Sequence, residues 1–74
     1  MKTYVEVFIS SDGAKASEVL EILTELGFQP SFGEQDFVYH WRKDVVLPEI
    51  LRFIDEIQEK LKGTNTLLKF TTIK

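Results

Sequence analysis

Few side chains in this sequence could take part in acid–base or nucleophilic chemistry, and they do not form a catalytic set. His40 is the only histidine, and the chain has no cysteine. If Glu6 and His40 lie on neighbouring strands, both face the same side of the sheet, where a carboxylate can orient an imidazole. With no nucleophile or second carboxylate beside them, we expect a surface ion pair. One histidine among scattered carboxylates provides no ligand set for a metal. The sequence therefore predicts no catalytic residues, no metal site and no cofactor.

The segment 10–15, Ser-Ser-Asp-Gly-Ala-Lys, is a candidate site for a small ligand or anion. It precedes a predicted helix, and the free N–H groups at a helix N-terminus can bind an anion. The residues that such a site would use are Ser10, Ser11, Gly13 and Lys15. The alternative is ordinary capping by Asp12 or Ser11, because either side chain can accept a hydrogen bond from these N–H groups.

A strand and a helix are predicted at the start of the chain. Residues 3–9 alternate, with Val5, Val7 and Ile9 on the expected core face. Residues 14–26 follow the i, i+3, i+4 spacing of an amphipathic helix. Its apolar stripe consists of Ala16, Val19, Leu20, Ile22, Leu23 and Leu26. Gly27 stands where a left-handed residue commonly ends a helix.

Residues 28–32 and 37–42 predict a pair of strands joined by the turn 33–36. Proline cannot donate a hydrogen bond to a ladder, so Pro30 places the first of these strands at a sheet edge. In the second strand the aromatic residues at 37, 39 and 41 share one face, and residues 38, 40 and 42 share the other.

The second helix is expected to begin between residues 44 and 48, with Asp44 as its cap and Pro48 in its first turn. Gly63 is expected to end it. Its predicted buried stripe is Leu47, Ile50, Leu51, Ile54, Ile57 and Leu61, flanked by Phe53. Residues 66–73 predict the last strand. If Lys69 points outward there, Leu68 and Phe70 point inward.

These elements predict one α+β domain over residues 1–74, a two-layer βαββαβ sandwich of the ferredoxin-like type. Each strand–helix–strand unit crosses over right-handedly. Two such units in one antiparallel sheet give the strand order 4-1-3-2, with both helices on one face. The second strand then lies at an edge, where Pro30 belongs.

The other sheet face has no helix to cover it and is the main candidate for an interaction surface. The residues expected on it are Tyr4, Glu6, Phe8, Val38, His40 and Arg42, together with Lys69, Thr71 and, if Lys69 points outward, Leu67 of the last strand. Apolar and aromatic side chains gathered on an open face are typical of a contact surface for a protein partner or a second copy of the chain. Half-exposed aromatic residues also occur in strands because they suit the pleated backbone.

Part of this face resembles the RNA-recognition motif, which has the same strand order. Thr3-Tyr4-Val5 partly matches the first-strand motif of that family, and Phe37-Val38 matches two positions of its third-strand motif. The resemblance implies bases stacked on the outward aromatic residues. The sequence departs from the motif because its leading basic residue and glycines are missing, and His40 replaces its last aromatic residue.

Charge and composition narrow the function classes further. Nine basic and twelve acidic residues give a net charge of −3, which disfavours nucleic acid because an acidic surface repels phosphate. We expect no membrane span and no signal peptide, hence a cytoplasmic protein.

The favoured function is a non-catalytic assembly or regulatory module that acts through the open face or an edge strand, on a protein partner or on a second copy in a dimer. A small-ligand or anion sensor at residues 10–15 is the alternative, and single-stranded RNA binding is the third.

Overall fold

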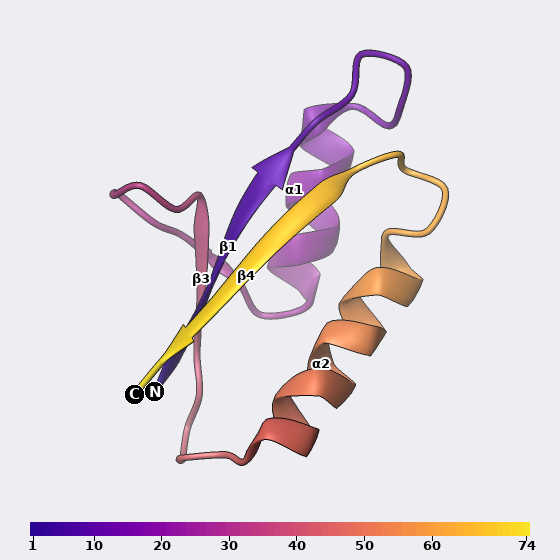
Figure 1. Ribbon diagram of the computed structural model, residues 1–74. Helices are drawn as coiled ribbons and strands as arrows, with labels where there is room; N and C mark the ends of the chain where they lie inside the picture. Colours follow the sequence, from indigo (N-terminus) through magenta and orange to yellow (C-terminus); the bar gives the residue numbers. More distant parts are fainter.

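The computed structural model describes residues 1–74 and contains two helices and four strands (Figure 1). In chain order the elements are β1 (Lys2–Phe8), α1 (Ala16–Glu25), β2 (Gln29–Pro30), β3 (Phe37–His40), α2 (Leu47–Lys60) and β4 (Leu67–Ile73). The succession strand, helix, strand, strand, helix, strand is the predicted one.

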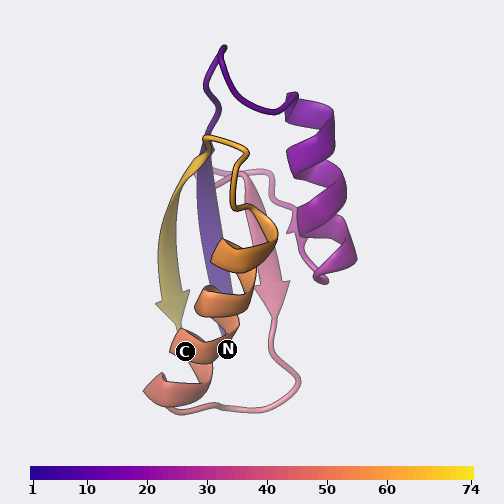
Figure 2. The ribbon, with the colours of Figure 1, turned by 90° about the vertical axis from the view of Figure 1, so that its right-hand side faces the viewer.

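The strands form one antiparallel sheet in the order β2-β3-β1-β4, which matches the predicted order 4-1-3-2. The central strand β1 pairs with β4 over its whole length, from Lys2 opposite Ile73 to Phe8 opposite Leu67. Both helices lie on the same face of the sheet (Figure 2). The opposite face is covered by no other part of the chain, so its side chains meet solvent or a partner.

The core lies between the helices and the sheet. It is small, because only nine residues are buried. Six of them form a single apolar cluster: Val5, Val19, Leu23, Phe28, Ile57 and Leu61. An aromatic group continues this cluster, with the Tyr39 and Phe53 rings 4.5 Å apart and the Tyr39 and Trp41 rings 5.0 Å apart. Such aromatic pairs contribute about 0.5–1.5 kcal/mol beyond the area that they bury.

A short chain of hydrogen bonds crosses the inner face of the sheet. Nε1 of Trp41 donates to Oγ1 of Thr3 over 2.8 Å, and the hydroxyls of Thr3 and Thr72 lie 2.8 Å apart. Thr3 is completely buried. The chain links β1, β4 and the residue just after β3, and it satisfies the polar atoms that burial would otherwise leave without partners.

The start of α1 differs from the prediction. The helix begins at Ala16 instead of residue 14, and its N-cap is Lys15, which makes no side-chain capping hydrogen bond. The predicted capping by Asp12 or Ser11 is therefore wrong, because residues 10–13 form a turn before the helix begins. The C-terminal prediction is confirmed, since Gly27 follows the last turn with a φ of 102°.

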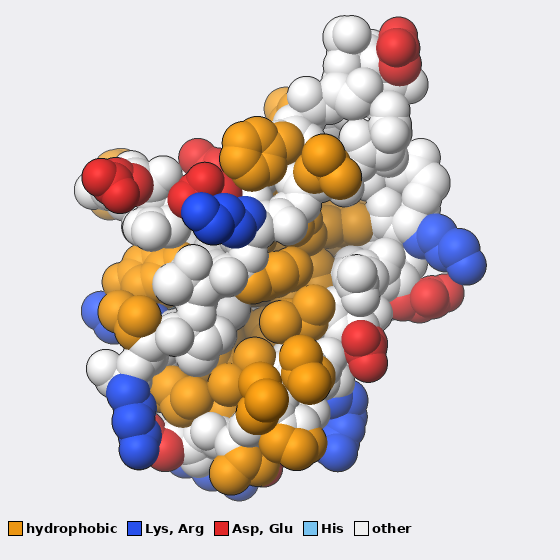
Figure 3. All heavy atoms as spheres, in the orientation of Figure 1, with side chains coloured by type: hydrophobic (Ala, Val, Ile, Leu, Met, Phe, Trp, Pro, Cys, Tyr) orange, Lys and Arg blue, Asp and Glu red, His pale blue; other side chains and the backbone are white.

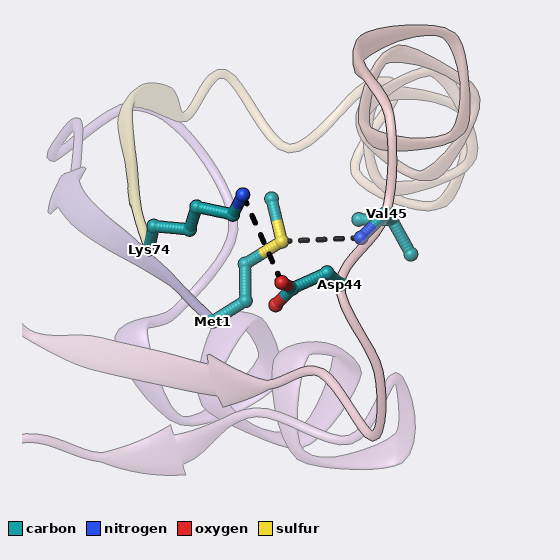
Figure 4. A network of polar contacts seen from close by, with 4 residues as sticks. All are labelled: Met1, Asp44, Val45 and Lys74. Carbon is teal, nitrogen blue, oxygen red and sulfur yellow. Dashed lines mark hydrogen bonds and ion pairs between the residues drawn. The ribbon is translucent and has the colours of Figure 1, made fainter.

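The start of α2 also differs. Its N-cap is Val46, without a side-chain hydrogen bond, so Asp44 is not the cap. The Asp44 carboxylate instead lies 3.8 Å from Nζ of Lys74 (Figure 4). Beside it, the backbone N–H of Val45 donates to Sδ of Met1 over 3.2 Å. These contacts hold both chain ends against the segment before α2, whose first turn contains Pro48 as predicted.

Several side chains that the periodicity assigned to the core are exposed. They are Ile9, Leu20, Leu47 and Leu51, with exposed fractions between 42 and 64%, and also Ala16. The helical stripes are wider than the sheet can cover, because β2 has only two residues and β3 only four. β3 ends at His40, before Arg42, and β2 ends at Pro30, which leaves Phe32 fully exposed.

Candidate functional site

The open face of the sheet is organised by the register of its strands. One row places Tyr4 between Val38 and Thr71, and a second row places Lys2 between His40 and Ile73. On β4, Lys69 lies opposite Glu6, and Leu67 lies opposite Phe8. From one end of the face to the other, the row of Phe8 is apolar, the row of Glu6 is charged, and the rows of Tyr4 and Lys2 are mixed.

The exposed apolar side chains of this face lie at its two ends, with Phe8 and Leu67 at one end and Ile73 at the other. Phe8 and Leu67 expose 53 and 73% of their surface, whereas Val38 exposes only 7%. Tyr4 is half-buried among its neighbours. The alternation within β1 and β3 correctly predicted that Tyr4, Phe8 and Val38 lie on the open face. Val38 on β3 is nonetheless buried, whereas the open-face residues of β4 (Leu67, Lys69, Thr71 and Ile73) are all exposed, so a partner would contact chiefly the β4 side.

The structure does not bring Glu6 and His40 together. The residue opposite His40 is Lys2, and Glu6 lies four positions further along β1, opposite Lys69. The predicted ion pair between Glu6 and His40 is therefore wrong. Arg42 is exposed but lies beyond the end of β3 and does not extend the sheet face.

The sequence placed the last strand at a sheet edge, but it did not show which backbone groups of β4 are free. In an antiparallel ladder each residue directs its N–H and C=O toward the same neighbouring strand. The N–H of Trp41 donates to the carbonyl of Met1, and the N–H of Asp36 donates to the carbonyl of Val5. The odd residues of β1 therefore face β3, and its even residues face β4.

The same alternation determines which groups of β4 are free. The even residues of β1 lie opposite the odd residues of β4. Leu68, Phe70 and Thr72 consequently direct their N–H and C=O groups away from β1. No strand lies on that side, because β4 is the end of the sheet. This edge is seven residues long and fully extended.

The two sheet edges differ in their capacity to pair. β2 contains only two residues, one of them Pro30, and both features are common means of preventing pairing at an edge. β4 has no proline and a single charge, Lys69. Figure 3 views the molecule from the β4 side and shows hydrophobic side chains gathered around a hollow between β4 and α2. The hollow has a volume of about 200 Å³ and is lined by Gln58, Leu61, Thr66, Leu67, Leu68 and Phe70.

The segment 10–15 packs against the loop between α2 and β4. Oγ of Ser10 accepts from the side-chain amide of Asn65 and from the N–H of Asp12. The N–H of Gly13 donates to the carbonyl of Ser10, and a Cβ at residue 13 would collide with the carbonyl oxygen of Thr64. The contacts of Ser10 and Gly13 are thus made within this turn and with the loop containing Asn65, whereas Ser11 and Lys15 are exposed.

A larger pocket opens beside α1, at the end of the sheet. Its volume is about 540 Å³, and its lining is mainly apolar: Val7, Ile9, Ala16, Ser17, Val19, Leu20, Pro30, Asp36 and Phe37. Oδ2 of Asp36 accepts from the N–H of Val7 over 2.8 Å. Phe37 packs against the core on the helix side, so the outward aromatic residue that the RNA-recognition motif would require at this position is absent.

No family model, curated protein or solved structure matches the chain. No three His, Asp or Glu side chains are grouped in a way that could hold a metal ion. Neither helix combines the length and the apolar character needed to cross a membrane.

Proposed function

We propose that this protein is a small non-catalytic assembly module that binds a protein partner by strand addition at the edge of β4. The observation that carries the proposal is the contrast between its two sheet edges. One edge is shortened and contains Pro30, while the other is seven extended residues long, of which Leu68, Phe70 and Thr72 direct free backbone groups outward. We also propose that the fold is of the ferredoxin-like type, which the element order, the strand order and the one-sided helices support.

Strand addition explains how such an edge provides both affinity and specificity. Backbone hydrogen bonds from the added strand would satisfy the free groups of Leu68, Phe70 and Thr72, and alternate side chains would select the partner. Leu67 and Ile73 expose 73 and 49% of their surface at the two ends of the strand. An added strand covers both, which favours binding at about 25 cal/mol per Å² of apolar area removed from water.

A labelled peptide tests whether the edge accepts a strand. The peptide has the sequence of residues 66–74 and is titrated with the protein while its fluorescence anisotropy is measured. N-methylation at the peptide position of Phe70 removes an N–H that would face the protein, and we expect affinity to fall at least about tenfold. N-methylation at the position of Thr71 alters an N–H that faces away, so binding should be retained. Equal binding of the two methylated peptides, or no binding of the unmodified one, would contradict the proposed function.

A further inference from the structure

We propose that the strand received at this edge is β4 of a second copy, paired antiparallel about a two-fold axis that passes through Phe70. This inference rests on the proposed function and adds the identity of the partner and the register of pairing. In this register each residue i lies opposite residue 140 − i of the other copy. All seven residues, Leu67–Ile73, then lie within the new ladder.

The backbone groups fit this arrangement. Leu68, Phe70 and Thr72 direct their N–H and C=O groups out of the edge. When two such edges pair, each of these residues must lie opposite a residue of the other copy whose N–H and C=O groups also point out of the edge. With the axis at Phe70, the two Phe70 residues lie opposite each other, and Leu68 lies opposite Thr72 of the second copy. All three positions therefore form pairs that exchange both hydrogen bonds.

The position of Lys69 favours this register of pairing over registers with the axis one or two residues away. The only charged residue of β4 is Lys69, and like charges directly opposite each other destabilise a strand pair. An axis at residue 69 would place the two Lys69 side chains opposite each other. An axis at residue 68 would place Lys69 opposite Leu67 and would pair only three residues of β4. An axis at residue 71 would place Lys69 opposite Ile73 and would pair only five. With the axis at Phe70, Lys69 lies opposite Thr71, and Glu6 of its own chain lies on its other side.

The exposed apolar side chains are also matched. On the open face Leu67 would lie opposite Ile73 of the second copy, and the symmetry repeats this contact at the other end. Both positions are non-hydrogen-bonded pairs, in which side chains approach most closely. Leu67 and Ile73 are both exposed in the single chain, and this pairing reduces their exposure.

The helix beside β4 continues the apolar surface. Gln58 lines the hollow together with Leu68 and Phe70, so this side of α2 faces the strand edge. Residues 47, 51, 54 and 58 have the i, i+4, i+7, i+11 spacing of one helix face. Leu47 and Leu51 on that face expose 64 and 50% of their surface. The two-fold axis would bring both α2 helices to the same side of the joined sheet, next to the join.

Disulfide trapping tests the partner and the register together, because the chain has no cysteine of its own. The two variants are Lys69→Cys and Thr71→Cys, both at exposed positions on the open face. One variant is isotope-labelled, the two are mixed in a glutathione redox buffer, and the covalent dimers are identified by mass. Residues in a non-hydrogen-bonded pair have Cα atoms about 4.5 Å apart, within disulfide range.

The proposed register predicts that the mixed disulfide between positions 69 and 71 exceeds either homodimer by about tenfold, because only that pair has disulfide geometry. A dominant disulfide between two copies of the same variant would overturn the register. The absence of any dimer in both the trapping experiment and a sedimentation measurement of the unmodified chain would overturn the second copy as partner. If the chain is monomeric but the peptide of residues 66–74 still binds with the expected N-methylation pattern, this inference fails and the proposed function stands.

Discussion

Replacing Thr3 by valine should test the hydrogen bonds that link Trp41, Thr3 and Thr72 on the inner face of the sheet. Valine keeps the shape and the strand preference of threonine but removes the hydroxyl that accepts from Nε1 of Trp41. The indole N–H then has no partner in a half-buried site. Leaving such a donor unsatisfied costs about 1–3 kcal/mol. The contact between Thr3 and Thr72 is lost as well.

The expected loss of about 2 kcal/mol is large for a chain of this size. Folded domains are stable by about 0.05–0.15 kcal/mol per residue, or roughly 4–11 kcal/mol for 74 residues. With a urea dependence of about 1 kcal/mol per molar, the unfolding midpoint should fall by about 2 M. Trp41 is the only tryptophan, so its fluorescence reports on both the unfolding and the altered site.

Thr72→Val provides the matched control. It removes the contact with Thr3 but leaves the bond from Trp41 to Thr3 intact. Its destabilisation should be about half that of Thr3→Val, near 1 kcal/mol. If Thr3→Val leaves both the urea midpoint and the emission maximum of Trp41 unchanged, these hydrogen bonds do not stabilise the sheet.

Three further substitutions test the fold. Gly13→Ala should lower the urea midpoint by at least about 1 M, because its Cβ would collide with the carbonyl of Thr64; an unchanged midpoint would show that the two loops are not in contact. Leu23→Asp should abolish the cooperative transition, since it buries an unpaired charge in the core, and a native-like melting curve would contradict the assigned core. Glu21→Gln, on the exposed side of the same helix, should change stability by less than about 0.5 kcal/mol in the same assay.

The order of the elements could be predicted from the sequence because it depends on local signals, and the strand order followed from the right-handed crossover of two strand–helix–strand units. Changes of period separated helices from strands, and Pro30 identified an edge strand. The helix caps could not be predicted in this way. Asp12 and Asp44 are typical capping residues, but residues 10–13 turn against the loop containing Asn65, and Asp44 approaches Lys74. These contacts join parts of the chain that are distant in sequence.

The candidate surface was predicted only in part for a similar reason. Alternation within β1 placed Tyr4 and Phe8 on the open face, but it could not show that Val38 is covered by its neighbours. The free groups of β4 depend on the register between strands, which alternation within one strand does not contain. The sequence does contain one signal for this edge. The segment that forms β4 has no proline, whereas the edge strand β2 contains Pro30.

Amide hydrogen exchange at two protein concentrations tests most directly whether β4 of one copy pairs with β4 of another. At low concentration the N–H groups of Lys69 and Thr71, which face β1, should be protected, while those of Phe70 and Thr72 should exchange rapidly. At high concentration Phe70 and Thr72 should become protected as well, because the second strand accepts their hydrogen bonds. If Phe70 and Thr72 exchange rapidly at every concentration, the edge of β4 does not pair with a second copy.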